Sequence, residues 1–324
     1  MASISKTDLL AELLDGVRAG GWVPFVLEEK HPFLLKATKA NKSIEFRVYI
    51  WNCTHGGKSR ARDEYRVQFT TMPRQRLQEK TLLLGWHDDT QVFAAWDITT
   101  HDNQDSISPS AQIKLSTLQA AHDGAFATQK KDNEIVVAFQ PFLLIEYVQA
   151  FSLLHSSGKA HRDIALLDDL ESLDDEEIAG ISNKERRTVI ATIKKKYRER
   201  SFREKVLQAY KNRCAFCRVQ LGLLDAAHII PVSAPGSTDE VVNGVALCKL
   251  HHLAYDTNLV AFDQDYKIKV SAARVRQLSN ADLSGGLKGF KAALEGSLAL
   301  PDNARHHPNR GYIRTSLRLR GWKP

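Results

Sequence analysis

Apolar residues near the amino terminus recur at the spacing of a helix. They share one face of a 3.6-residue period: Leu9, Leu10, Leu13, Leu14 and Val17. Ser5 and Asp8 precede that face at the spacing of a capping box, and Gly20 and Gly21 end it. The pattern therefore predicts an amphipathic helix at the start of the chain.

From residue 23 the pattern changes to short runs rich in β-branched and aromatic residues, which are typical of strands. The expected strands cover residues 45–51, 65–70, 81–86, 91–98 and 134–139. A helix is expected at residues 142–154. Residues 163–177 are then too acidic to form core, whereas residues 183–210 are basic and helical in composition.

These elements predict an α+β protein with two domains, since 324 residues exceed one average domain of ~100 to 200 residues. Residues 1–164 would form a strand-rich domain, residues 165–200 an acidic and then basic helical linker, and residues 201–324 a second domain. Within the second domain we expect a strand at 266–271, a helical stretch around 287–294 and an Arg-rich end.

The formal net charge of +7 lies entirely in the carboxyl-terminal part. Residues 1–160 hold 18 Lys+Arg against 18 Asp+Glu, residues 161–185 hold 2 against 9, and residues 186–324 hold 25 against 11. Neutralisation of phosphates supplies most non-specific affinity for nucleic acids, so this asymmetry indicates a polyanionic partner. A solvated basic surface is the alternative.

No apolar run approaches the ~20 residues that span a bilayer. The amino terminus carries Asp8, Glu12 and Asp15 among its leucines, unlike the basic start of a signal peptide. We therefore expect a cytoplasmic protein that has no membrane partner.

Three of the four cysteines lie in the carboxyl-terminal part, and the fourth, Cys53, is most simply a buried apolar residue. Cys214 and Cys217 form a C-x-x-C pair, and Cys248 and His251 repeat its spacing. Zinc prefers four tetrahedral sulfur or nitrogen ligands, so the two pairs predict a closed structural Zn²⁺ site. The 30 residues between the pairs exceed the ~15 to 20 of a plain zinc ribbon, which indicates a further function.

Three residues follow in the order H, N, H: His228, Asn243 and His252. The first lies in Ala-His-Ile-Ile-Pro, the second opens Asn-Gly-x-x-Leu-Cys, and the third comes directly after the last zinc ligand. Together with the zinc pairs, these motifs resemble the HNH nuclease family, whose ββα-metal fold sets two strands and a helix around one divalent ion. The resemblance covers residues 201–263 and implies a zinc-stapled HNH nuclease domain.

Phosphodiester hydrolysis needs a base for the attacking water and a metal that neutralises charge in the transition state. His228 is the expected general base, because a neutral imidazole accepts a proton near pH 7. The family resemblance implies that Asn243 orients this base. His252 and Asp256 are four residues apart, so one helix face could present both to a catalytic Mg²⁺, Mn²⁺ or Ni²⁺ ion.

Ala227 departs from the family, many of whose members place a metal-binding Asp or His immediately before the base. Asp225, three residues before His228, is the third ligand that we expect in its place. Water is the alternative third ligand, since Mg²⁺ usually keeps several waters.

In the amino-terminal domain, residues 47–68 predict two strands joined by a basic, glycine-rich loop. Gly56 and Gly57 would permit close backbone approach, and four side chains could face DNA phosphates: His55, Lys58, Arg60 and Arg62. The spacing of a P-loop is absent. A solvated hairpin tip is the alternative interpretation.

Five aromatic residues of this domain have two interpretations: Tyr49, Trp51, Tyr65, Trp86 and Trp96. They could line a pocket that holds an extruded base by stacking. They could equally be core, which is the commoner place for any single tryptophan. Residues 47–68, together with Trp86 and residues 92–97, resemble the leading domains of prokaryotic restriction-type HNH proteins.

Arginines recur at the carboxyl-terminal end of the chain: Arg310, Arg314, Arg318 and Arg320. Their intervals would let several of them, Arg314 and Arg318 in particular, meet one phosphate-bearing DNA strand. A fraying charged terminus is the alternative.

The sequence thus predicts a metal-dependent endonuclease of the restriction type, whose first domain recognises a sequence or a modified base in double-stranded DNA. A homodimer would supply the two active sites that symmetric cleavage of both strands requires. Two alternatives remain: a non-catalytic, zinc-containing DNA-binding protein, and a toxin or RNA-directed nuclease with the same active site.

Overall fold

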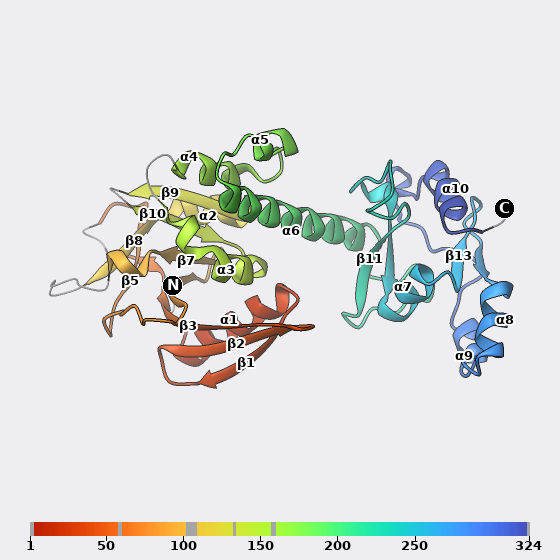
Figure 1. Cartoon of the computed structure of the whole chain (residues 1–324), viewed down its shortest axis with the longest axis horizontal. Helices are drawn as coiled ribbons and strands as arrows, with labels where there is room; N and C mark the ends of the chain where they lie inside the picture. Colours follow the sequence, from red (N-terminus) through yellow and green to blue (C-terminus); the bar gives the residue numbers. More distant parts are fainter. Residues whose placement is uncertain (1–2, 58–59, 102–108, 132–133, 157–159, 323–324) are drawn as a thin grey trace. The chain divides into compact units, whose positions relative to one another are not determined.

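The computed structural model describes residues 3–57, 60–101, 109–131, 134–156 and 160–322. The chain divides into two compact units, Met1–Tyr197 and Arg198–Pro324, and Figure 1 traces it through both. Each unit buries apolar residues of its own.

The first unit is built on a seven-stranded sheet with the order β1-β2-β3-β6-β7-β10-β9. Its strands are β1 (Val23–Glu28), β2 (Phe33–Lys39), β3 (Lys42–Asn52), β6 (Thr81–His87), β7 (Val92–Trp96), β9 (Phe126–Lys131) and β10 (Glu134–Phe139). β3 and β6 pair in parallel, and the other neighbours pair antiparallel. Four of the five expected strands belong to this sheet, and the fifth, β5, belongs to a smaller one.

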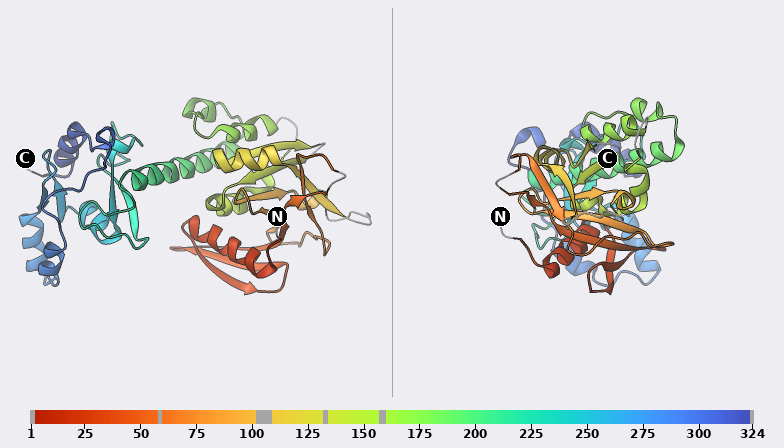
Figure 2. Two further views of the ribbon diagram at one scale, coloured as in Figure 1. Left: turned by 180° about the vertical axis from the view of Figure 1, so that it is seen from behind. Right: turned by 90° about the vertical axis from the view of Figure 1, so that its left-hand side faces the viewer.

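Side chains alternate between the two faces of each strand, so the sheet separates two cores. In β3, Phe46, Val48 and Ile50 enter one core, and Tyr49 and Trp51 enter the other. Helices cover the first face: α1 (Lys6–Ala19), α3 (Leu144–Leu154) and the amino-terminal half of α6 (Lys184–Ala209). The second face is covered by α2 (Leu115–Gly124) and by a sheet of β4 (Thr54–His55), β5 (Glu64–Gln68) and β8 (Ser110–Lys114) (Figure 2).

Local signals in the sequence explain where the helices of this unit begin. The capping box at α1 is confirmed, because the Ser5 side chain accepts from the Asp8 N–H and the Asp8 carboxylate accepts from the Ser5 N–H. The helix expected at 142–154 is α3, which follows a turn of 3₁₀ helix, η2 (Pro141–Leu143). A second such turn, η1 (Ile98–Thr100), follows β7.

The five aromatic residues that had two interpretations belong to the cores of the first unit. Trp86 is buried on one face of the large sheet, whereas Trp51 and Trp96 are buried on the opposite face. None of these three tryptophans is more than 5% exposed. Tyr49 and Tyr65 are also buried, in the same core as Trp51. The core interpretation is therefore confirmed.

The second unit begins at Arg198, three residues before the start expected at residue 201, but residues 165–197 belong to the first unit and not to a separate linker. The acidic segment folds into α4 (Ala160–Ile164), η3 (Ala165–Asp169) and α5 (Asp175–Ala179). Its leucines stand between the carboxylates and are buried in the first core: Leu167, Leu170 and Leu173. A count of charged residues could not show that these leucines are buried together. α6 then continues from the first unit into the second.

The second unit contains the hairpin of β11 (Leu224–His228) and β12 (Gly244–Cys248), followed directly by α7 (Lys249–Asp256). The carboxyl-terminal half of α6 packs against this hairpin at Gly244. A Cβ atom there would lie 2.3 Å from Cγ2 of Val206 and 3.0 Å from the ring of Phe202. Only glycine permits this approach of helix and strand.

The rest of the second unit comprises a hairpin, β13 (Val260–Phe262) and β14 (Ile268–Val270), helices α8 (Ala272–Asn280), α9 (Leu287–Ala292) and α10 (Arg310–Leu319), and turns η4 (Val241–Asn243) and η5 (Ala304–His306). The Arg-rich end is not a fraying terminus, because Ile313 and Ser316 of α10 are buried. Arg320 donates to the Tyr255 carbonyl over 3.0 Å and lies over the Tyr255 ring. Arg320 therefore stabilises the fold of the second unit.

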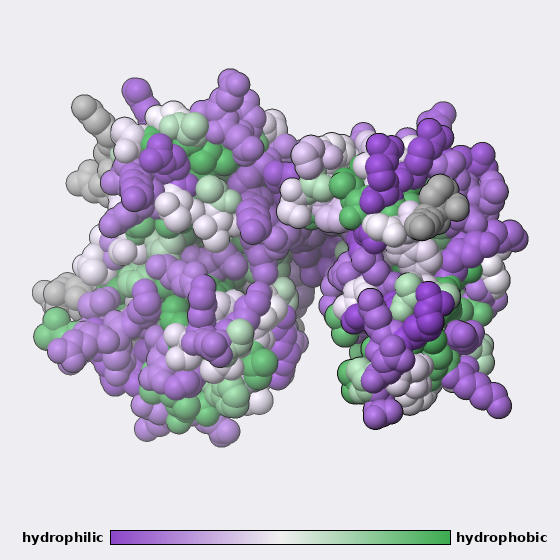
Figure 3. Space-filling model, turned by 45° about the vertical axis from the view of Figure 1, so that its right-hand side comes forward, coloured by the Kyte–Doolittle hydropathy of each residue, from purple (hydrophilic) through white to green (hydrophobic). Residues whose placement is uncertain are grey.

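Among the described residues, no helix is long and apolar enough to cross a membrane. The face shown in Figure 3 is mostly hydrophilic, with separate apolar patches. The exposed large apolar side chains include Leu250 and Leu253 on α7.

Candidate active site

Four residues of the second unit bring their ligand atoms together, and we call them the sulfur cluster: Cys214, Cys217, Cys248 and His251. The four atoms lie within 4.8 Å of one another. The first two residues stand in the turn after α6, which Arg218 closes with a φ of 63°. Cys248 ends β12, and His251 lies in the first turn of α7. The sequence-predicted zinc ligands thus form one group.

The spacing within the sulfur cluster fits a tetrahedral ion. The Nδ1 atom of His251 lies 3.6 Å from the Cys214 Sγ and 3.3 Å from the Cys248 Sγ, and the Cys217 and Cys248 sulfurs are 4.0 Å apart. A zinc ion ~2.3 Å from sulfur and ~2.0 Å from nitrogen would separate neighbouring ligands by ~3.5 to 3.8 Å. The cluster could therefore hold Zn²⁺ with little movement.

Electrostatics also favours a cation at the sulfur cluster. Burial raises the pKa of Cys217 to about 12, and the neighbouring Cys214 and Cys248 sulfurs add to that rise. Burial acts in the same direction on Cys214, but hydrogen bonds from His251 and from backbone N–H groups outweigh it and lower the pKa of Cys214 to about 6. Bringing several thiolates together in this partly buried place is costly without a positive ion.

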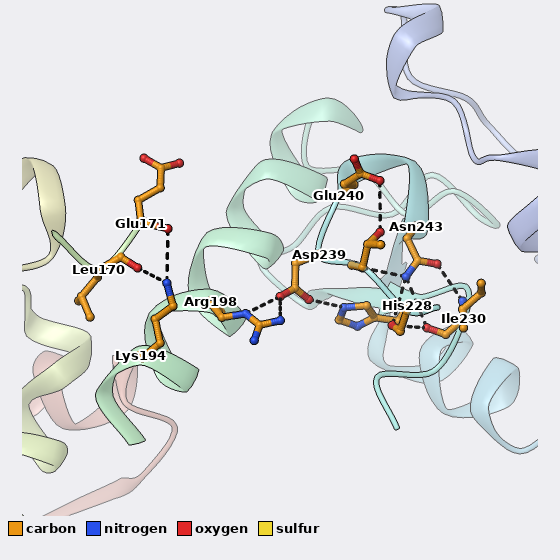
Figure 4. Close-up of polar contacts among 11 residues, drawn as sticks. Leu170, Glu171, Lys194, Arg198, His228, Ile230, Asp239, Glu240 and Asn243 are labelled. Atoms are coloured by element: carbon orange, nitrogen blue, oxygen red, sulfur yellow. Dashed lines mark hydrogen bonds and ion pairs between the residues drawn. The ribbon is translucent and has the colours of Figure 1, made fainter. Parts of the chain in front are cut away.

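His228 is the last residue of β11, and two contacts hold its ring. The ring stacks on Phe202 of α6, with centroids 3.8 Å apart and planes inclined by 17°. Its Nε2 atom lies 3.1 Å from Oδ1 of Asp239, in the loop between the two strands. Oδ2 of the same carboxylate accepts from Nε and a terminal nitrogen of Arg198, over 2.9 and 2.7 Å (Figure 4).

Asn243 is fully buried and ties the loop after β11 to the strand that follows. Its Oδ1 accepts from the Ile230 N–H over 2.9 Å, and its Nδ2 donates to the Thr238 carbonyl over 2.8 Å. The Asn243 carbonyl accepts from the Ile229 N–H over 2.8 Å. These bonds position the backbone directly after His228 and the loop that carries Asp239, as Figure 4 shows. Asn243 therefore contacts the backbone next to His228.

The expected ligands of the catalytic ion lie together but do not converge on one point; we call them the carboxylate cluster: Asp225, His252 and Asp256. Nδ1 of His252 is 3.8 Å from Oδ2 of Asp225, and Nε2 of His252 is 3.3 Å from Oδ2 of Asp256. The two carboxylates therefore face opposite nitrogens of one ring. Among the described residues, the sulfur cluster is the one group of three or more His, Cys, Asp or Glu side chains whose ligand atoms converge.

Cations already accompany Asp225. Lys249 Nζ lies 2.6 Å from its Oδ2, and Arg203 Nε lies 3.3 Å from its Oδ1. Burial acts to raise the pKa of Asp225, but the hydrogen bond and charge of Lys249 outweigh it and hold that pKa below its usual value. The carboxylate is thus ionised and available to a metal. Side chains three residues apart leave a strand on opposite faces, so Asp225 meets α7 while His228 stacks on α6.

Residues 214–263, which contain both clusters, match the family model described as HNH endonuclease. These residues form an HNH endonuclease domain. Residues 44–148 of the first unit match a second family model, methylase-associated X1. No curated protein matches the chain. Among solved structures, the "Modification dependent TagI restriction endonuclease" is 12% identical and aligns over 85% of this chain and 81% of its own, with a TM-score of 0.30.

The predicted DNA-binding residues are spread over both units. His55 is exposed, although its ring contacts the Ala61 carbonyl, and Arg60 pairs with Glu64 over 3.2 Å. Arg62 is exposed, and Lys58 lies outside the described residues. In the second unit, exposed Arg314 and Arg318 line a cavity of about 460 Å³ together with other residues: Asp263, Gln264, Asp265, Leu317 and Trp322.

Four residues that contribute to the HNH domain and its surroundings were not assigned their contacts from the sequence. Asp239 lies in an irregular loop, eleven residues after His228, where no periodic spacing marks it. Arg198 and Lys249 are basic residues among many, and only the fold shows which carboxylate each one meets. Phe202 lies in the segment 183–210 that was expected to be helical, but its stacking on His228 depends on the tertiary structure.

Proposed function

We propose that this protein is a DNA endonuclease whose HNH domain hydrolyses phosphodiester bonds with the help of a divalent metal ion. The observation that carries the proposal is the HNH family match over residues 214–263, which contain His228, Asn243 and His252 in the family's order. His228 is the general base that accepts a proton from the attacking water. Asn243 keeps the backbone beside it in place.

Asp225 and Nδ1 of His252 would hold the catalytic ion, which could be Mg²⁺, Mn²⁺ or Ni²⁺. Such an ion supplies positive charge that stabilises the transition state of the phosphate. Metal-bound histidines commonly donate their other N–H to a carboxylate. Asp256 lies at that other nitrogen. In place of the ligand role expected from the sequence, we therefore propose that Asp256 orients His252. Water would complete the coordination of the ion.

We assign Zn²⁺ to the sulfur cluster, because three cysteines and one histidine are typical ligands of a closed structural zinc site. This ion would hold the turn after α6 to the start of α7, and so would fix the hairpin between them. His251 and His252 are adjacent in α7, so the structural ion also positions the helix that carries the catalytic ligand.

We further propose that the enzyme is of the restriction type and acts on modified or foreign double-stranded DNA in the cytoplasm. The name of the family matched by residues 44–148, methylase-associated X1, links the first unit to DNA modification. The basic excess of residues 186–324 suits DNA phosphates, and Arg62, Arg314 and Arg318 are exposed to meet them. Cutting both strands symmetrically would need a homodimer.

A plasmid-cleavage assay tests the proposal. Purified protein is incubated with matched unmodified and cytosine-modified plasmids in Mg²⁺, Mn²⁺ or Ni²⁺, and a structured RNA is added as competitor. We expect ion-dependent cutting by the wild type, loss of cutting in His228→Ala, and DNA affinity within about twofold of wild type in that variant, because the base does not bind phosphate. The control is Asp302→Asn, an exposed carboxylate in the same unit.

Each alternative has its own outcome in this assay. DNA binding without cutting in any of the three ions would favour a zinc-containing binding protein. Preferential cutting of the RNA would favour an RNA-directed nuclease. Equal cutting of the two plasmids would leave the endonuclease in place but remove the modification-dependent role.

A further inference from the structure

The proposed general base, His228, contacts Asp239, which in turn contacts Arg198. His228 Nε2 faces Oδ1 of Asp239 over 3.1 Å, and Arg198 binds Oδ2 of the same carboxylate through two nitrogens. Figure 4 shows the three side chains in line, with Asp239 between the other two. Burial acts to raise the pKa of Asp239, but the hydrogen bonds of His228 and Arg198 outweigh it and lower that pKa. Asp239 is therefore a carboxylate that accepts on both sides.

The ring of His228 has little freedom to turn away from this carboxylate. Phe202 covers one face of the ring at a centroid distance of 3.8 Å, and the ring is only 17% exposed. A neutral imidazole carries its proton on one nitrogen and a lone pair on the other. A carboxylate can only accept, so Nε2 must hold the proton opposite Asp239. Nδ1 is then the nitrogen with the lone pair.

We propose that Asp239 is a positioning residue that holds His228 as the Nε2–H tautomer, with Nδ1 ready to accept the proton of water, and that Arg198 fixes Asp239. The proposal rests on the proposed function of His228. Arg198 keeps its charge at all working pH values and has donors only, so it always presents a donor to Asp239. When His228 takes up a proton, the same carboxylate stabilises the imidazolium.

The substitution Asp239→Asn makes a specific chemical prediction. Arg198 needs an acceptor, so it will take the amide oxygen of the new side chain. The amide NH₂ will then face His228 Nε2 and will force the ring proton onto Nδ1. The base is lost although the shape of the side chain is preserved. We expect the turnover rate to fall about 10²- to 10⁴-fold, the range that a general base contributes, with DNA affinity unchanged.

Nitrogen NMR of the full-length protein, labelled with ¹⁵N-histidine, reads the tautomer without any need for cleavage. The His228 signals are assigned by their loss in His228→Ala. We expect the Nε2–H form in the wild type and the Nδ1–H form in Asp239→Asn. The matched control is Asp302→Asn, which makes the same change at an exposed ion pair with Lys211 in the same unit and should leave tautomer and rate unchanged.

Two further variants separate positioning from a merely structural role. Asp239→Glu keeps an acceptor-only carboxylate, so it should retain the Nε2–H form and recover at least tenfold of the rate lost in Asp239→Asn. Arg198→Met combined with Asp239→Asn frees the amide oxygen to turn to His228, so the Nε2–H form should return and the rate should rise above that of Asp239→Asn alone. A purely structural defect would instead grow worse when the second contact is removed.

The outcomes are distinct from those of the proposed function. An Nδ1–H tautomer in the wild type overturns the positioning role even if the protein cuts DNA. An Nε2–H tautomer in both the wild type and Asp239→Asn, with rates within twofold, also overturns it. If no nucleic acid is cut, the expected tautomers still support the positioning of His228, while the nuclease proposal fails.

Discussion

The two clusters of proposed metal ligands in the HNH domain differ in how closely their ligand atoms already lie together. In the sulfur cluster, four ligand atoms already lie within 4.8 Å of one another. In the carboxylate cluster, the ligand atoms face one another in pairs across the ring of His252, and cations stand beside Asp225. Adjacent residues of one helix, His251 and His252, thus belong to two clusters of different construction.

The difference follows from the positive charges that lie next to the ligand atoms of each cluster. Among the described residues, His251 is the basic side chain that contacts the thiols of the sulfur cluster, so we expect a metal ion to supply further positive charge. The carboxylates have Lys249, Arg203 and Arg320 as partners, over 2.6, 3.3 and 3.7 Å. We therefore expect the first ion to be required for folding and the second only for chemistry.

Cys217→Ser gives the largest expected effect, because it removes one ligand from the cluster that needs its ion. Structural zinc in small domains contributes ~10 to 16 kcal/mol of binding free energy, more than the stability of a typical domain. We expect the second unit to lose bound metal and its cooperative unfolding transition, measured by metal analysis and by thermal unfolding. The matched control is Cys53→Ala, which changes a buried cysteine of the first unit. This variant should keep the metal of the sulfur cluster. Full metal content in Cys217→Ser would remove the contrast between the clusters.

Asp256→Asn tests whether this carboxylate orients His252 or binds the ion itself. Loss of an orienting partner typically weakens metal affinity about 10- to 100-fold. We expect cleavage to require that much more Mn²⁺, with the original maximal rate restored at saturation and with structural metal content unchanged. The control is Asp302→Asn, an exposed carboxylate of the same unit. A maximal rate that no Mn²⁺ concentration restores would argue that Asp256 is a ligand.

The sequence predicted the sulfur cluster better than the carboxylate cluster, for a physical reason. Each zinc pair lies within one turn of chain, so the x-x spacing alone brings Cys214 to Cys217 and Cys248 to His251. The i, i+4 spacing also placed His252 beside Asp256, as expected. It could not show which ring nitrogen faces each carboxylate, because that depends on how α7 packs against β11.

The same distinction applies to the folds of the two units. Strands with a continuous apolar run, such as β10 at Glu134–Phe139, were predicted to the residue. The acidic segment was misplaced, because the burial of Leu167 and Leu170 depends on a core built from distant strands. The helical nature of α10 was missed, because its charged surface concealed the buried Ile313 and Ser316.

Gly244→Ala tests the packing of α6 against the β11–β12 hairpin, which does not depend on a metal ion. The added methyl would lie 2.3 Å from Val206 Cγ2 and 3.0 Å from the Phe202 ring, so α6 must shift from the hairpin. Overpacking of this kind typically costs about 1 to 3 kcal/mol. We expect a lower urea midpoint and slower cutting, because the stacking partner of His228 moves, while the sulfur cluster keeps its metal. Gly289→Ala, where nothing lies within 4 Å of the added methyl, is the control. Unchanged stability in Gly244→Ala would show that the helix and hairpin are not packed as described.

Lys249→Met gives the smallest expected effect and the only expected gain. Lys249 shares Oδ2 of Asp225 with the proposed ion, and its side chain is 68% exposed, so the pair contributes at most ~1 kcal/mol. Removing the competing charge should strengthen Mn²⁺ binding by up to about fivefold, since ~1.4 kcal/mol corresponds to a factor of ten. The measurement is the Mn²⁺ concentration that gives half-maximal cutting, with Lys288→Met, an exposed lysine of α9, as the control. Weaker Mn²⁺ binding in Lys249→Met, with DNA affinity unchanged, would mean that the lysine supports the ion site and that Asp225 is not the ligand it competes for.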